Sequence, residues 1–176
     1  MSQNRLFATT VLLLFTLVAP LLLGAAPSAP SAGDTQNVKK AVSDLRSVGT
    51  ATWAWYKAEV EPRRSAEAKK AAEKLAKEGK PVDLANIPVI STADLRKILV
   101  PKYIQTVPEQ DPWGNPYEYR LNTTDPNAPQ LIAVRTAGQD GEFSSTSYDI
   151  GGFPVSRTGE DIAWMDGYFI RWPAAN

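Results

Sequence analysis

Apolar residues recur at helical spacing between Asn37 and Glu59. They fall every three or four positions, at Val38, Val42, Leu45, Val48, Thr52 and Trp55. This spacing puts them on one stripe of an α-helix, with the charged residues lying off the stripe. The pattern predicts a helix over residues 37–59 that covers a sheet, with Asp34 or Thr35 capping its start.

A second pattern, with period two, follows in the C-terminal half. Residues 117–121 alternate aromatic or aliphatic side chains with charged ones, which is typical of a half-buried strand. The run 130–135 predicts a second strand, and together the two predict an antiparallel hairpin. The Asp-Gly pair at 166–167 predicts a tight turn, followed by a last strand at 168–172 that pairs with 162–164.

Two more helices are predicted between these patterns. The highly charged segment 61–80 predicts a solvated helix at Ser65–Lys77, in which Leu75 is the one large apolar residue. A short helix, Ala93–Leu99, is predicted with Ser91 or Thr92 as its cap. We expect the charged helix to be an insert in the domain.

The first residues have the order of a secretory signal peptide. Arg5 precedes an apolar run over 6–23, and the small residues Gly24, Ala25 and Ala26 follow it. We therefore expect residues 1–26 to be a signal peptide, the alternative being an uncleaved membrane anchor. Residues 27–36, rich in Pro, Ser, Ala and Gly, predict a flexible linker.

Composition narrows the function classes. The 176 residues are 43% hydrophobic and 22% charged, with 19 basic and 19 acidic residues, which suits one globular domain. A zero net charge does not favour nucleic acid as a partner. The chain has no Cys and no His, which excludes Cys–His and Ser–His catalysis and the usual zinc ligands. A bound metal would need oxygen ligands, as calcium and magnesium do.

Five acidic residues surround one long loop near the C-terminus. They are Asp140, Glu142, Asp149, Glu160 and Asp161. One interpretation is a calcium site that orders the loop, and another is a solvated acidic surface. A third pairs Asp140 with Glu160 or Asp161 as the two carboxylates of a small glycoside hydrolase.

Several motifs in a fixed order resemble a known family. Residues 95–104 (Leu-Arg-Lys-Ile-Leu-Val-Pro-Lys-Tyr-Ile) precede 111–117 (Asp-Pro-Trp-Gly-Asn-Pro-Tyr), 138–141 (Gly-Gln-Asp-Gly) and 161–162 (Asp-Ile). This order is similar to the C-terminal region of type II secretion major pseudopilins. The resemblance covers about Val38–Trp164, interrupted by the charged insert, and implies a long helix laid on a small antiparallel sheet.

The resemblance also implies a calcium site. Members of the family bind calcium in the loop after the hairpin. Carried over by position, Asp140 and Asp161 are the best ligand candidates in this chain, and Glu160 is a weaker one.

The N-terminus departs from the family pattern. Pseudopilins are cut after a Gly that precedes Phe-Thr-Leu-(Ile/Val)-Glu, and residues 15–18 (Phe-Thr-Leu-Val) resemble that run. Leu14 stands in place of the Gly, however, and Ala19 in place of the Glu. We therefore expect no processing by prepilin peptidase, and a pseudopilin-like module placed behind an ordinary signal peptide.

These observations combine into one expectation. Residues 37–176 should form an α+β domain of a non-enzymatic structural or binding protein, periplasmic or secreted, with type II secretion or pilus-like components as partners. One alternative is an independent exported binding module that reuses the fold, and another is a small carboxylate hydrolase. An uncleaved N-terminal segment would instead anchor the protein in the inner membrane.

Overall fold

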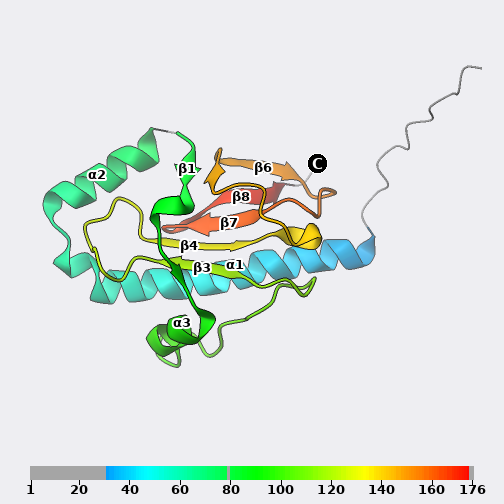
Figure 1. The fold of residues 1–176 in the computed structure, drawn as a ribbon, viewed down its shortest axis with the longest axis horizontal. Coiled ribbons are helices and arrows are strands. Elements are labelled where there is room, and N and C mark those ends of the chain that lie inside the picture. The colour runs from blue at the N-terminus through cyan, green and yellow to red at the C-terminus, as the bar shows by residue number, and fades with distance from the viewer. Residues whose placement is uncertain (1–30, 79, 175–176) are drawn as a thin grey trace, which may run out of the picture.

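A long N-terminal helix lies along one face of a β-sheet (Figure 1). The computed structural model describes residues 31–78 and 80–174. Helix α1 spans Ala32–Glu59. No helix in these two ranges is long and apolar enough to cross a membrane. The predicted signal peptide, residues 1–26, lies outside the described residues.

Helix α1 begins earlier than predicted because a capping box forms at its start. The Ser31 side chain accepts a hydrogen bond from the backbone N–H of Asp34 at 3.1 Å, and the Asp34 carboxylate accepts one from the N–H of Ser31 at 3.1 Å. This reciprocal arrangement satisfies two otherwise free N–H groups. The predicted cap and the second half of the predicted linker, residues 32–36, are therefore wrong; residues 27–30 of that linker lie outside the described residues.

The predicted apolar stripe of α1 is confirmed at four of its six positions, whereas Val42 and Trp55 are only half-buried at its edge. Its buried residues follow helical spacing: Val38, Ala41, Leu45, Val48, Gly49, Ala51, Thr52 and Tyr56. The buried core that they share with the sheet includes Val134, Ile162 and Trp164. The helix is thus held by burial of one face.

The main sheet has six strands in the order β2-β3-β4-β7-β8-β6. They are β2 Val89–Ile90, β3 Glu118–Leu121, β4 Ile132–Thr136, β6 Gly151–Pro154, β7 Ile162–Met165 and β8 Tyr168–Ala174. All neighbours are antiparallel except β6 and β8, which are parallel. The sheet is larger than the small antiparallel sheet that the resemblance implies, because the short strands β2 and β6 extend it at its two edges.

Both predicted strand pairings are confirmed. The loop that joins β3 and β4 is longer than the tight turn that joins β7 and β8. Tyr119 pairs with Val134 in one, and Met165 pairs with Tyr168 across the tight turn in the other. Asp166 at that turn has φ +42°, a left-handed conformation that Asp tolerates better than most residues. The architecture is α+β, as predicted.

Smaller elements surround this frame. Helix α2 spans Ala66–Lys77 with Ser65 as its cap, and α3 spans Thr92–Leu99 with Ser91 as its cap, so both predicted helices are confirmed. Strands β1 (Val82–Asp83) and β5 (Ser147–Tyr148) form a separate two-stranded sheet. Single-turn 3-10 helices lie at Glu61–Arg63, Leu84–Asn86 and Gly138–Asp140.

Both faces of the main sheet are covered. Successive side chains of a strand point to opposite faces, so Ile132 and Val134 of β4 pack in the core with α1. Ala133, between them, belongs to a second cluster with Leu84 and Ile87. Arg135 follows the same alternation and therefore lies on the second face, where the acidic loop is found.

Candidate functional site

The acidic loop is organised around Asp161, directly before β7. This residue is 1% exposed. Its Oδ2 accepts hydrogen bonds from the backbone N–H of Ser144 at 3.0 Å, the Ser144 hydroxyl at 2.8 Å and the Tyr148 hydroxyl at 2.7 Å. Its Oδ1 is also buried and has no hydrogen-bond partner among the described residues. Half of this carboxylate is thus satisfied by the protein and half is not.

A buried arginine links Asp161 to the centre of the sheet. Arg135, 3% exposed, donates from Nε to Glu118 at 2.8 Å and from Nη1 to the Tyr148 hydroxyl at 2.7 Å. Its guanidinium lies 3.8 Å from the centroid of the Phe143 ring. No sequence pattern points to Arg135 as a buried residue, because a charged residue at the end of a predicted strand is ordinarily exposed.

The environment keeps both members of this ion pair charged. Burial raises the pKa of Glu118, but hydrogen bonds from Arg135 and Arg120 outweigh it and hold that pKa below its usual value. Burial lowers the pKa of Arg135, and its bonds to Glu118 and Tyr148 reverse that effect. Burial and the adjacent Asp161 carboxylate raise the pKa of Tyr148, so its hydroxyl stays protonated and can donate.

Asp140 lies at the other side of the loop, at the end of the 3-10 helix Gly138–Asp140. It is exposed, and its Oδ1 accepts a hydrogen bond from the backbone N–H of Glu142 at 3.1 Å. Its Oδ2 lies against the backbone of Gly159, where an added Cβ would be 3.0 Å away. The structure therefore brings Asp140 next to the segment that precedes Glu160 and Asp161.

Glu160 is engaged in ion pairs. Its carboxylate pairs with Arg171 of β8 and, at 3.4 Å, with Arg157. Burial raises the pKa of Glu160, but the hydrogen bond from Arg171 dominates and the pKa lies below its usual value. Two arginines thus occupy the oxygens that a metal ion would need.

The two motifs that carry the family resemblance contact each other beside this loop. Asp111 accepts the backbone N–H groups of Trp113 and Asn115, both at 2.9 Å, which closes the turn of the first motif. The Asn115 amide then donates to the carbonyl of Gly138 at 2.7 Å. Thr136, at the end of β4, donates its hydroxyl to Asp111.

Gly138 is required at this contact. Its φ is +73°, and an added Cβ would lie 2.6 Å from the carbonyl oxygen of Thr158 and 2.8 Å from that of Glu160. Two backbone carbonyls therefore converge on the turn that carries Asp140. Backbone carbonyls and carboxylates are the oxygens that calcium uses.

The fit to a metal ion is mixed. Within residues 31–78 and 80–174, no three acidic side chains gather closely enough to hold one. Asp161 fits, because its buried Oδ1 lacks a partner, and Glu160 does not. Asp140 fits as an exposed carboxylate beside converging carbonyls.

Comparison with known proteins adds nothing to this geometry. Searches against known protein families, curated proteins and solved structures found no match to this chain.

Proposed function

We propose that this protein is an exported, non-enzymatic structural or binding protein, built like the soluble domain of a type II secretion major pseudopilin. The fold supports this proposal, because helix α1 lies along one face of a largely antiparallel sheet (Figure 1). The contact between Asn115 and Gly138 supports it too, since it joins the two motifs on which the resemblance rests. The protein would act in the periplasm or outside the cell.

Calcium at the acidic loop is part of the proposal. The observation that carries it is the partnerless Oδ1 of Asp161, a buried carboxylate oxygen that costs free energy unless something coordinates it. Asp161 and Asp140 would hold the ion, together with backbone carbonyls of the loop. Bound calcium would tie the loop to β7 and order it.

A thermal melt of the full chain, with calcium and with chelator, tests this site. Calcium at a hundredfold excess over its dissociation constant adds about 2.7 kcal/mol to the free energy of unfolding. We expect Asp161→Asn and Asp140→Asn to abolish the rise in melting temperature that calcium produces. Asp149→Asn is the matched control, because Asp149 is an exposed acid of the same loop and should leave the rise intact. A melt that calcium does not move would overturn the site.

The partner class needs a separate experiment. Chemical crosslinking in the native cells, followed by mass spectrometry, should capture pseudopilins or other secretion components. Recovery of the protein as a free monomer in the medium would favour the alternative, an independent binding module.

The hydrolase alternative is less well supported. Asp161 is 1% exposed and Glu160 is paired with Arg171, so neither is available to a substrate as Asp140 is. An inverting or retaining pair requires two carboxylates that flank the same bond.

A further inference from the structure

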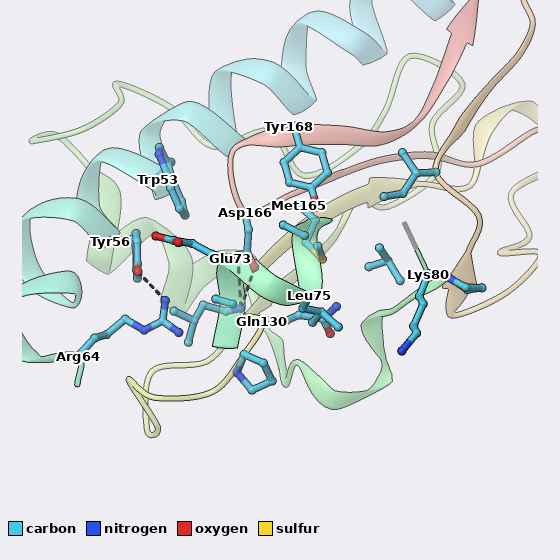
Figure 2. A pocket seen from close by; sticks show the side chains of 17 residues that line it. Trp53, Tyr56, Arg64, Glu73, Leu75, Lys80, Gln130, Met165, Asp166 and Tyr168 are labelled. Atoms are coloured by element: carbon cyan, nitrogen blue, oxygen red, sulfur yellow. Dashed lines mark hydrogen bonds between the residues drawn. The ribbon is translucent and has the colours of Figure 1, made fainter. Parts of the chain in front are cut away.

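A cavity lies between the charged insert and the tip of the β7–β8 hairpin (Figure 2). Its volume is about 230 Å³. Residues of α1, α2 and the hairpin turn line it, among them Trp53, Glu73, Leu75, Asp166 and Tyr168. Helix α2 forms one side of the cavity. The cavity therefore depends on the charged insert that interrupts the pseudopilin-like pattern.

Most of the wall is apolar. Leu75 and Ile150 both line the cavity and are 36% and 39% exposed. They are two of the three large hydrophobic residues that the described ranges leave exposed, the other being Val89. Apolar side chains that remain exposed around one hollow are typical of a site for a small ligand.

Two acidic side chains line the cavity and form no ion pair among the described residues. Asp166 accepts hydrogen bonds from the backbone N–H groups of Leu131 at 3.3 Å and Ile132 at 2.9 Å. Glu73 is an exposed residue of α2. In Figure 2 the labelled side chain of Asp166 lies between Trp53 and Tyr168, and that of Glu73 extends below Trp53 toward Tyr56.

The two basic residues at the cavity are committed elsewhere. Arg64 donates from Nη1 to the Tyr56 hydroxyl at 2.8 Å and from Nη2 to the carbonyl of Ala128 at 2.9 Å. Its Nε is buried and has no hydrogen-bond partner among the described residues. Lys80 pairs with Glu78 at 2.9 Å. Lys80 is thus neutralised by Glu78 and Arg64 is held by neutral acceptors, which leaves Glu73 as the charged group of the wall with neither an ion pair nor a hydrogen bond among the described residues.

The aromatic rings of the cavity wall differ in how accessible they are to a ligand. The ring of Trp53 stacks on Tyr56 with centroids 4.6 Å apart, and Lys57 lies 5.2 Å from its centroid, so both contacts restrict access to that ring. Tyr168, half-buried, is the aromatic ring left for a ligand. A ring next to carboxylates favours a positively charged group.

We propose that this cavity binds a small organic cation, an ammonium group on an aromatic or aliphatic body. The ammonium group pairs with Glu73 and donates a hydrogen bond to the Asp166 carboxyl group, and the body packs against Leu75, Met165 and Tyr168. A dry cavity of about 150 Å³ holds benzene, so the volume here suits an arylalkylamine. This inference is independent of calcium and of export.

To test this, the purified full chain is titrated with two probes of equal size, and binding is monitored by the NMR chemical shifts of the protein. The cation is 2-phenylethylammonium and the neutral counterpart is 2-phenylethanol. We expect saturable shifts around Leu75 and Tyr168, with the cation binding about tenfold more tightly. Glu73→Gln should weaken the cation about two- to fivefold, the range for an exposed charge pair, and leave the alcohol unchanged.

Two more variants complete the design. Glu67→Gln, on the first turn of α2 and outside the cavity wall, should change neither affinity. Ala76→Phe places a ring at an exposed position of the wall and should abolish binding of both probes without disturbing the fold. Equal affinity for cation and alcohol, binding that survives Ala76→Phe, or no saturable binding of the cation would each overturn the proposal.

Discussion

The hydroxyl of Tyr148 joins Asp161 to Arg135 across the second face of the sheet. It lies 2.7 Å from Oδ2 of Asp161 and 2.7 Å from Nη1 of Arg135. Arg135 donates to the hydroxyl oxygen, and the hydroxyl donates its proton to the carboxylate. One neutral side chain thus connects a buried cation with a buried anion.

Replacing Tyr148 with Phe should be costly. Tyr148→Phe leaves donor and acceptor groups of Arg135 and Asp161 buried without this partner, which lowers the free energy of unfolding by about 1–3 kcal/mol. Chemical denaturation measures the loss. Tyr168→Phe is the matched control, because Tyr168 is only half-buried and should change stability by less than about 0.5 kcal/mol. Equal effects of the two substitutions would contradict the proposed role of the hydroxyl.

Glu118 predicts a loss of stability in acid. Its folded-state pKa lies below the unfolded value of 4.5, so its contribution is present above that pH and is lost as pH falls through the folded pKa. Glu118→Gln should lower the free energy of unfolding by about 3 kcal/mol at pH 7, because it leaves the charge of Arg135 buried without its carboxylate.

The difference in the free energy of unfolding between wild type and Glu118→Gln should become smaller as pH falls below about 4.5. Denaturation curves at several pH values measure it. A difference that stays constant with pH would show that Glu118 does not act through its charge.

Asp166 predicts the opposite dependence of stability on pH, a loss of stability as pH rises. The residue is half-buried, and protein atoms crowded around its carboxyl group raise its pKa from 3.8 to about 7, against the backbone hydrogen bonds that favour the anion. The folded state therefore holds this proton more tightly than the unfolded state. The stabilisation is present below about pH 3.8 and is lost as pH rises through about 7.

Asp166→Asn tests this slope with little change in shape, because Asn also tolerates the positive φ and retains an oxygen acceptor. We expect its melting temperature, relative to wild type, to increase as pH rises from 4 to 8. NMR titration of the carboxyl carbon gives the pKa itself. A midpoint near 4 would contradict the prediction.

Gly49 allows α1 to approach the sheet closely. A Cβ at this position would lie 2.5 Å from Cδ2 of Trp164 in β7, a distance that requires the ring or the helix to shift. Gly49→Ala should therefore destabilise the fold by about 1–3 kcal/mol, although Ala is the better helix former.

Gly33 provides the comparison within the same helix. A Cβ there would have Oγ of Ser31 as its nearest neighbour, at an ordinary 3.6 Å. Gly33→Ala should be neutral or stabilising, by up to about 1 kcal/mol. Thermal melts of both variants measure the contrast, and a stabilising Gly49→Ala would argue against close packing on Trp164.

Local sequence patterns alone predict most of the main helices and strands. Helix α1 follows from its apolar stripe, α2 and α3 from their serine caps, and the strand pairs from alternation and the Asp-Gly turn. Each of these signals depends on residues a few positions apart, so neighbours along the chain contain the information.

The short strands cannot be predicted in this way, because the contacts that form them join residues far apart in the chain. Strand β1 has two residues, and its partner β5 lies more than sixty positions away, with Val82 opposite Tyr148. Strand β6 pairs in parallel with β8, so its backbone hydrogen bonds depend on a segment that joins the sheet after it. Two to four residues are too few to show an alternation that separates a strand from a loop.

For the candidate sites, the sequence pointed to Asp140, Glu160 and Asp161 but did not distinguish their surroundings. Folding buries Asp161, pairs Glu160 with Arg171 and leaves Asp140 exposed. The same folding places Arg135 beneath the loop and closes a cavity between α2 and the β7–β8 turn. Residue type and spacing determine which elements form, but burial and charge pairing depend on which distant elements pack together, and those contacts exist only in the folded chain.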